Sequence, residues 1–332
     1  MSELYPWQLN DWQRLLALRE RPPQGLLFKG AKGIGKLSLA LNYAHSLLCE
    51  RVQASGLACD VCPACHWLSQ GSHPDFRLLQ PDALSQSGEE SESGKKASKQ
   101  ITVEQVRELA GFLGMTSHQG GMRVIVIYPA EAMNSNAANA LLKNLEEPPR
   151  NTLFILVTHK PQQLLPTLLS RCVLFGLAVP DATAATAWLR SQGTADPEQA
   201  LAAAAYSPLL AMQGDAQVGA DERAKLLRAL RTPAALDVFA MAELLQKTEQ
   251  VLVVQWLQQW CYDLIAMKQA GSLRYHTGDE AVIRKLVTPV AVLELVRLQK
   301  LLQTAKREAQ HTLNPKLFFE SLLLAYRQLL KA

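Results

Sequence analysis

The sequence predicts an α/β domain with a parallel sheet, followed by an all-helical region. Short apolar runs at residues 25–29, 76–80, 123–128 and 152–158 have the length and composition of buried strands. Segments with helical spacing of apolar residues separate these runs, which is typical of a parallel sheet with helices on both faces. After Pro180 the strand patterns stop and alanine-rich helical patterns begin.

Length and charge limit the class of protein. A chain of 332 residues is long enough for two or three domains. Its 34 basic and 30 acidic residues give a net charge of only +4, which is weak evidence for nucleic-acid binding by the chain as a whole. The sequence shows neither a secretory leader nor an apolar run long enough to cross a bilayer, so we expect a cytoplasmic protein with no membrane partner.

The first apolar run leads into a segment that resembles a phosphate-binding loop. In FKGAKGIGKLSLA (residues 28–40), Gly30, Gly35 and Lys36 fit the frame G-x-x-x-x-G-K-[S/T], and Gly33 lies inside the loop. In such a loop the backbone N–H groups surround the phosphates, the lysine neutralises them and the final hydroxyl binds Mg²⁺.

The loop lacks the groups that hydrolysis needs. Leu37 stands where the hydroxyl is required, and Ser38 lies one position too late on the helix. The strand that should end in an acidic pair ends in Tyr128-Pro129, and Glu131 lies beyond it; neither tyrosine nor proline binds Mg²⁺ as a carboxylate does. We therefore expect no ATP hydrolysis, whereas nucleotide binding stays open. The alternative is a tight strand-to-helix turn with a solvated lysine and no ligand.

Four of the six cysteines lie within 17 residues and predict a metal site. Cys59, Cys62 and Cys65 form C-x-x-C-x-x-C, and Cys49 lies ten residues upstream. Four thiolates suit tetrahedral Zn²⁺, and a closed site of this kind is structural rather than catalytic. An iron–sulfur run would need a cysteine where Ser69 stands.

Two alternatives remain for the cysteine segment, which covers about residues 49–75. His66 or His73 could replace Cys49 as the fourth ligand, but a lone histidine is more often a hydrogen-bonded or surface residue than a ligand. The segment could also be a zinc ribbon that binds nucleic acid. Residues 59–71 contain no lysine or arginine to contact phosphates, so we prefer a structural role or a protein contact.

The rest of the chain is less specific. Residues 82–100 have a Ser, Gly and charge bias without apolar periodicity, and we expect a solvated, mobile loop. From about residue 219 the pattern is helical, with apolar residues on more than one face, as in residues 251–270 and 317–332. These helices form either a self-contained bundle or one that also contacts partner subunits.

Residues 136–172 strongly resemble the clamp-loader branch of the AAA+ ATPases. Members of this branch carry a helix ending in LLK-x-LEEPP, then a sensor strand and a Ser-Arg-Cys signature. Here these features are residues 141–149, the run ending at Thr158, and Ser170-Arg171-Cys172. Within the branch, the YPW at residues 5–7, the four cysteines and the missing acidic pair are similar to a member that does not turn over ATP.

The resemblance implies a three-part fold. A RecA-like AAA+ domain with the inserted zinc module would cover residues 1–178, a small helical lid 179–217, and a helical collar that joins the subunits of a ring 218–332. The implied partners are the motor subunits (tau/gamma), the delta subunit, and, through the complex, the sliding clamp and primer-template DNA.

The resemblance also implies a role for the Ser-Arg-Cys signature. Arg171 would reach into the ATP site of a neighbouring motor subunit, where such a guanidinium contributes roughly 10³ to 10⁵ in rate in other phosphoryl-transfer enzymes. The alternative is a helix-terminal arginine that caps carbonyls or pairs with a carboxylate. Leu209 would stand in place of a sensor arginine on the lid.

An active ATPase motor of the same branch is the alternative function, and Tyr128-Pro129 argue against it because a motor needs a metal-binding carboxylate there. Glu146 and Glu147 could be taken for a catalytic pair. Next to Pro148 they are better explained as a helix end facing the neighbouring subunit, or simply as a solvated acidic face.

Overall fold

The computed structural model describes residues 4–84, 98–114, 121–212, 219–309 and 314–330. Most of the loop expected at residues 82–100 lies outside these ranges. Contacts divide the chain into two compact units, which are residues 1–188 with 207–209, and residues 189–206 with 210–332.

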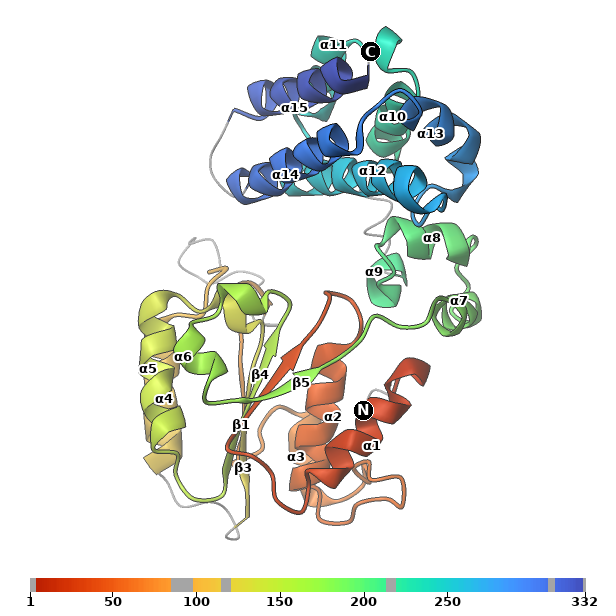
Figure 1. Cartoon of the computed structure of the whole chain (residues 1–332). Helices are drawn as coiled ribbons and strands as arrows, with labels where there is room; N and C mark the ends of the chain where they lie inside the picture. The colour runs from red at the N-terminus through yellow and green to blue at the C-terminus, as the bar shows by residue number, and fades with distance from the viewer. Residues whose placement is uncertain (1–3, 85–97, 115–120, 213–218, 310–313, 331–332) are drawn as a thin grey trace. The chain divides into compact units, whose positions relative to one another are not determined.

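The first unit contains a five-stranded parallel sheet with the strand order β2-β3-β4-β1-β5 (Figure 1). The predicted parallel sheet with accompanying helices is confirmed. Four strands coincide with the apolar runs, and the fifth is a short edge strand that the sequence did not predict. The strands are β1 (Gly25–Lys29), β2 (Phe76–Leu79), β3 (Arg123–Ile127), β4 (Thr152–Thr158) and β5 (Val173–Gly176).

Helices cover both faces of this sheet, so β1 alternates its side chains between two cores. Leu26 and Phe28 pack with α1 and α2, whereas Leu27 packs with the helices of the opposite face. The helices of the first face are α1 (Leu9–Ala17) and α2 (Lys36–Leu48), and those of the second are α4 (Val103–Gly114), α5 (Ser135–Glu146) and α6 (Pro166–Leu169).

Shorter elements connect these layers. The 3-10 helix η1 (Pro6–Gln8) precedes α1, and α3 (Pro63–Ser69) carries the end of the cysteine segment. The other short elements of the first unit are η2 (Asp82–Leu84), η4 (Ala130–Ala132) and η5 (Pro161–Gln163). The residues of α7 (Ala182–Ser191) and α9 (Pro208–Met212) are divided between the two units, and α8 (Pro197–Ala203) belongs to the second.

The second unit contains a helical bundle built around the longest helix, α12, which packs against α13 and α14, while α11 packs against α15. Asp237 caps α11 by accepting from two backbone N–H groups, and Gly271 ends α12 in the left-handed conformation. The elements are α10 (Ala220–Leu230), η6 (Pro233–Ala235), α11 (Val238–Leu245), α12 (Gln250–Ala270), η7 (Thr277–Asp279), α13 (Glu280–Val287), α14 (Val292–Glu308) and α15 (Pro315–Leu330).

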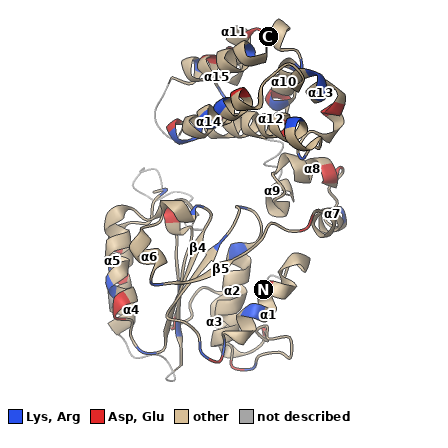
Figure 2. Ribbon diagram, in the orientation of Figure 1, with Lys and Arg blue, Asp and Glu red and all other residues tan. Residues whose placement is uncertain are grey.

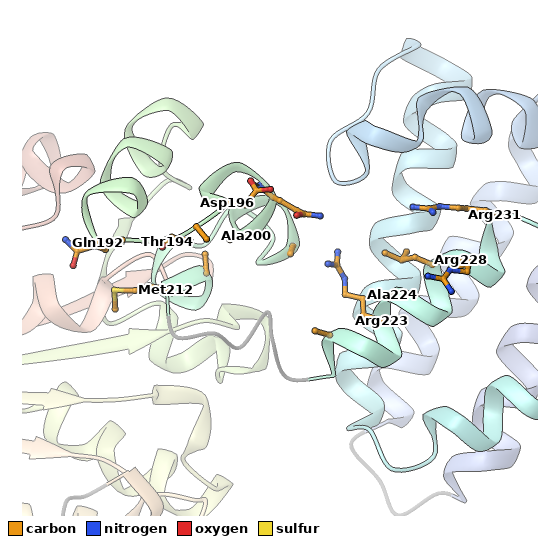
Figure 3. A pocket seen from close by; sticks show the side chains of 16 residues that line it. Gln192, Thr194, Asp196, Ala200, Met212, Arg223, Ala224, Arg228 and Arg231 are labelled. Atoms are coloured by element: carbon orange, nitrogen blue, oxygen red, sulfur yellow. Dashed lines mark hydrogen bonds between the residues drawn. The ribbon is translucent and has the colours of Figure 1, made fainter.

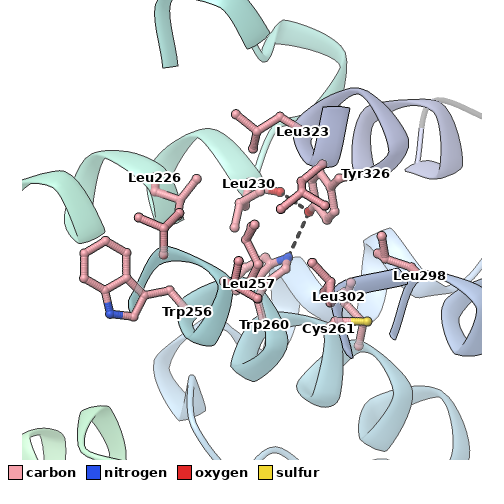
Figure 4. Close-up of a cluster of buried hydrophobic side chains, with 14 of the residues drawn as sticks. Leu226, Leu230, Trp256, Leu257, Trp260, Cys261, Leu298, Leu302, Leu323 and Tyr326 are labelled. Atoms are coloured by element: carbon pink, nitrogen blue, oxygen red, sulfur yellow. Dashed lines mark hydrogen bonds between the residues drawn. The ribbon is translucent and has the colours of Figure 1, made fainter. Parts of the chain in front are cut away.

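A polar contact lies inside the bundle core (Figure 4). The indole Nε1 of Trp260 donates to the hydroxyl of Tyr326 at 2.9 Å, and that hydroxyl donates to the carbonyl oxygen of Leu230 at 2.6 Å. The contact joins α12, α15 and the end of α10, because a buried hydroxyl must find partners within the core. Within the described ranges, every helix is too short or too polar to cross a membrane.

Candidate functional site

In the loop between β1 and α2, backbone carbonyl groups of the loop accept hydrogen bonds from the ammonium group of Lys36. Lys36, the first residue of α2, is only 2% exposed, and its Nζ donates to the carbonyl oxygen of Gly30 at 2.8 Å and also to that of Ala31. Gly33 and Gly35 have φ angles of 79° and 86°, which favour glycine and give the loop its tight turn. Burial lowers the pKa of Lys36 to about 8, partly opposed by the charge of Glu131. The turn is tight, and its lysine is buried rather than solvated.

The amino-terminal segment packs onto this loop. The Trp7 indole Nε1 donates to the carbonyl oxygen of Ile34 at 3.0 Å, and Gln8 Nε2 donates to that of Gly35 at 2.8 Å. The Tyr5 ring lies so close that a Cβ atom added at Gly35 would be 2.6 Å from its Cδ2. These aromatic residues of the YPW segment therefore occupy the space beside the loop backbone.

The segment in which Leu209 was expected to replace a sensor arginine also contacts the loop. The backbone N–H of Leu209 donates to the carbonyl oxygen of Gly33 at 3.0 Å. Trp188 meets the rings of Tyr5 and Trp7 edge-on, with centroid distances of 5.5 and 5.3 Å. Leu209 thus contacts the loop through its backbone, and its side chain carries no charge.

Beyond β3, the Glu131 carboxylate joins two strand ends. It accepts a hydrogen bond from the Thr158 hydroxyl at 2.7 Å and another from the backbone N–H of His159 at 3.0 Å. The Tyr128 hydroxyl lies 3.3 Å from Nε2 of His159. Burial, with a smaller effect from Lys36, lowers the pKa of His159 to about 4, so this imidazole is neutral near pH 7. The Glu131 carboxylate thus holds the end of β4 through these hydrogen bonds.

Arg171 lies two residues after the end of α6, with its guanidinium held at the surface. Its Nη2 is 2.6 Å from Glu146 Oε1, and its Nη1 donates to the carbonyl oxygen of Thr167 at 3.0 Å. The Ser170 hydroxyl donates to the same carbonyl at 3.0 Å. The side chains of Arg171 and Glu146 are 35% and 49% exposed, so water or another chain can reach the pair.

Cys172, in contrast, is a packing residue. It is 8% exposed and burial raises the pKa of its thiol to about 11. A Cβ atom added at Gly25 would lie 3.1 Å from Cys172 Sγ, 3.0 Å from the carbonyl oxygen of Arg171 and 3.4 Å from Leu145. The glycine at the start of β1 therefore sets how closely the Ser-Arg-Cys segment approaches the sheet.

The phosphate-type loop and Arg171 lie at opposite ends of β1. The backbone of Arg171 touches Gly25, the first residue of the strand, whereas the loop begins at Gly30, just after its last residue. Five strand residues span about 16 Å. All strands run in the same direction, so Arg171 lies at the amino-terminal ends of the strands and the loop at their carboxyl-terminal ends (Figure 1). Arg171 and Lys36 therefore form no common site.

The four cysteines come together in space. Their sulfur atoms all lie within 4.8 Å of one another, with Cys49 and Cys62 at 4.0 Å and Cys59 and Cys65 at 4.0 Å. The backbone N–H of Cys59 donates to Cys49 Sγ at 3.2 Å, and that of Cys65 points to Cys62 Sγ at 3.5 Å. Backbone N–H groups, first that of Val61, lower the pKa of Cys59 to about 6, whereas burial raises the pKa of Cys49 and Cys65. This group can hold one metal ion.

The neighbouring histidines are engaged elsewhere. Nε2 of His66 is 3.1 Å from the side-chain amide of Gln70, and Nδ1 of His73 accepts from the backbone N–H of Asp75 at 3.0 Å. Among the residues that the structure describes, the group of possible metal ligands contains the four cysteines alone. Sulfur separations near 4 Å are close to those across a tetrahedron of about 2.3 Å Zn–S bonds.

Sequence comparison gives the family. The model of the family described as DNA polymerase III, delta subunit, matches residues 7–181, and the model described as the C terminal of this delta subunit matches residues 219–328. The delta' subunit of DNA polymerase III from Pseudomonas aeruginosa is 38% identical over 287 residues, covering 84% of this chain and 80% of that protein. This chain belongs to the DNA polymerase III delta' family. The expected relationship to the clamp-loader subunits is confirmed.

Similarity to another delta' subunit supports the same family assignment. The Haemophilus influenzae protein is 30% identical over 279 residues, covering 81% of this chain and 79% of that protein. Among solved structures, a gamma subunit-related protein from Thermotoga maritima aligns over 96% of this chain and 99% of that chain, with 17% identity and a TM-score of 0.47. That structural similarity is too low to add to the delta' assignment.

A pocket of about 920 Å³ lies in the second unit of this delta' family chain (Figure 3). Arg223 and Arg228 line it from α10, Arg231 lines it from just after that helix, and Asp196 lines it from just before α8. Arg231 pairs with Asp279 at 2.9 Å, and Figure 2 shows acidic and basic residues mixed on the bundle helices. The lining contains none of the site residues that the sequence predicts.

The sequence did not predict two contacts in this delta' family chain, that of Gln8 with the loop and that of Arg171 with Glu146. No sequence pattern predicts that Gln8 holds the loop, because a single glutamine before a helix is not distinctive. The sequence does place Glu146, the partner of Arg171, at a helix end. Spacing along the chain cannot show which residues of two separate helices pair with each other. Both contacts are tertiary and depend on how η1, α5 and α6 lie against the rest of the first unit.

Proposed function

We propose that this delta' family chain is a clamp-loader subunit that does not hydrolyse ATP and supplies Arg171 to the ATP site of a neighbouring motor subunit. Through that contact it helps to load the sliding clamp onto primed DNA. Ser170 and Cys172 support the arginine, the first by its bond to Thr167 and the second by packing against Gly25.

The observation that carries the proposal is the separation along β1. Arg171 is partly exposed and lies at the end of the strand opposite to its own loop. A guanidinium in that position cannot reach a phosphate held by Lys36, yet it is open to another chain. An arginine supplied in trans stabilises the charge that develops on the transferring phosphoryl group.

The loop supports the second half of the proposal. Lys36 is bonded to the loop carbonyls, Leu37 has no oxygen for Mg²⁺, and Glu131 is engaged by Thr158. The loop of Gly30, Gly33 and Gly35 then acts as a structural turn rather than as an ATPase centre. ATP binding there would first require Lys36 to leave two carbonyl groups that it now satisfies.

We further propose that Cys49, Cys59, Cys62 and Cys65 hold a structural zinc ion. Bound zinc would tie the end of α2 to the start of α3, and with four thiolates it leaves no position for a reacting water. The proposed domains are residues 1–178, 179–217 and 218–332. The proposed partners are the tau/gamma motor subunits, the delta subunit and, through the complex, the clamp and primer-template DNA.

Steady-state ATP hydrolysis by the reconstituted loader, with clamp and primed DNA, tests the role of Arg171. We expect Arg171→Ala to reduce turnover at the served site by roughly 10³ or more while the complex still assembles. Arg190→Ala, which removes an exposed arginine paired with Glu198 at 3.9 Å, is the matched control and should match wild type. An unchanged rate for Arg171→Ala in the assembled loader would rule out the trans role.

The isolated chain tests the alternative of an active motor. We expect no ATP turnover by the chain alone. Turnover that Lys36→Ala abolishes would show instead that the loop is a working ATPase site.

A further inference from the structure

The guanidinium of Arg171 is already bound to an anion within its own chain. Glu146 Oε1 lies 2.6 Å from Nη2, while Nη1 is directed to the carbonyl oxygen of Thr167 and to the Ser170 hydroxyl at 3.5 Å. A phosphate and a carboxylate bind the same edge of a guanidinium, because both present oxygen atoms to its N–H groups. The carboxylate therefore occupies the edge that a phosphate would use.

The protein backbone fixes where this carboxylate lies. Glu146 is the last residue of α5, and Pro148 and Pro149 prevent the helix from continuing. Leu145, one residue earlier, is buried in the core beside Gly25. The carboxylate thus projects from a rigid helix end beside α6, rather than from a loop.

The pair is weak enough to be replaced. Both side chains are partly exposed, and ion pairs of this kind contribute at most about a fivefold change in an equilibrium constant. A terminal phosphate carries more charge and more acceptor oxygens than one carboxylate. Exchange of Glu146 for phosphate therefore requires only rotation of two surface side chains.

We propose that Glu146 is a positioning residue that occupies the phosphate-binding edge of Arg171 until the terminal phosphate of the neighbour's nucleotide replaces it. This inference rests on the trans role proposed above for Arg171. It assigns the acidic end of α5 a specific function, which is to compete with the phosphate for the arginine. Loss of the carboxylate then makes the arginine more available, whereas loss of a contact that merely supports the arginine would make it less effective.

The first test measures the arginine in the isolated full-length chain. Phenylglyoxal modifies accessible arginines, and mass spectrometry of peptides follows Arg171 separately from the others. We expect Glu146→Gln, which keeps the shape but removes the charge, to modify Arg171 two- to fivefold faster than wild type. Glu147→Gln is the matched control on the adjacent exposed acidic residue and should leave the rate unchanged. Equal rates for wild type and Glu146→Gln would overturn the inference.

The second test uses the reconstituted loader. We expect Glu146→Gln to raise kcat/KM for ATP by two- to fivefold, because phosphate no longer competes with a carboxylate. A value equal to or below that of wild type overturns the inference. Arg171→Ala distinguishes the two levels of failure. If it lowers turnover while Glu146→Gln has no effect, the trans role stands and the competition does not. If it has no effect, the trans role fails, and the modification rates report only an internal ion pair.

Discussion

Lys36 and Gly30 are joined by a hydrogen bond of 2.8 Å from the ammonium to the carbonyl oxygen, which closes the loop after β1 on itself. The lysine is buried, and a carbonyl group of the loop itself accepts its hydrogen bond. The lysine of the G-x-x-x-x-G-K frame thus contributes hydrogen bonds that hold the loop together.

The burial of Lys36 predicts a specific pH dependence of stability. Burial lowers the pKa of Lys36 in the folded chain to about 8, below its usual value of 10.5. The unfolded chain therefore binds the proton more tightly between these values, and the contribution of Lys36 to the free energy of unfolding rises as pH increases from 8 to 10.5. We expect the difference in stability between wild type and Lys36→Met to change in this direction, by up to about 1.4 kcal/mol per pH unit. Urea unfolding at several pH values measures it; a difference that does not vary with pH would contradict it.

Gly25 predicts how the arginine segment responds to a single methyl group. In Gly25→Ala the new Cβ would be 3.0 Å from the carbonyl oxygen of Arg171, and the backbone there must shift. We expect a loss of about 1–3 kcal/mol in stability and a lower ATPase rate of the assembled loader. Gly111→Ala is the control, because its Cβ meets no atom within 4 Å on α4, and it should be neutral or slightly stabilising. Identical behaviour of the two variants would show that Gly25 does not position Arg171.

The cysteine group predicts one bound zinc ion per chain. Cys62→Ser removes one of the four ligands, and we expect loss of zinc together with a lower Tm, because binding energy of a structural metal adds to folding energy. Elemental analysis of the purified chain and thermal unfolding measure both. Cys261→Ala, which alters a buried thiol in the second unit, should retain the metal. Full zinc content in Cys62→Ser would exclude this ligand set.

The bundle core predicts a cost for one hydroxyl. Tyr326→Phe leaves Trp260 Nε1 and the carbonyl oxygen of Leu230 without their shared partner. Unpaired buried polar groups destabilise a protein by about 1–3 kcal/mol each, so we expect the free energy of unfolding to fall by at least about 1 kcal/mol. Tyr262→Phe, at a side chain that is 42% exposed, should have a much smaller effect. Denaturant unfolding compares them, and equal losses would place the energy elsewhere.

Much of the first unit could be predicted because its signals are local. The runs at residues 25–29 and 152–158 became β1 and β4 without change of bounds, since continuous apolar residues of strand length are hard to place elsewhere. The edge strand β5 was missed: Val173 and Leu174 are exposed at its start, so it has no continuous buried run. The other edge strand, β2, was predicted from the run at residues 76–80, so the exposed start of β5, and not its edge position, explains why β5 was missed.

The candidate sites show the same difference between local motifs, which the sequence predicts, and tertiary contacts, which it does not. Spacing was enough to group Cys59 with Cys62 and Cys65, because a metal-type motif is local. It was not enough to show that Lys36 is buried, or that Tyr5 and Gln8 lie against the loop, since those contacts join segments 26 or more residues apart. A motif gives the residues of a loop, and tertiary packing decides what those residues bind.

The opposite placement of the two ends of β1 gives the chain a polarity within any assembly. A two-fold pair of identical copies would bring like ends together, whereas head-to-tail contacts bring the arginine end of one subunit to the loop end of the next. In the role proposed for Arg171, this chain places its arginine in the ATP site of one neighbour. A neighbour's arginine would not promote hydrolysis at the loop of this chain, because we propose that this loop does not hydrolyse ATP. If Arg171 has that role, we expect this chain at the terminal position of a directional row of ATP sites, where a second copy in the row would interrupt it.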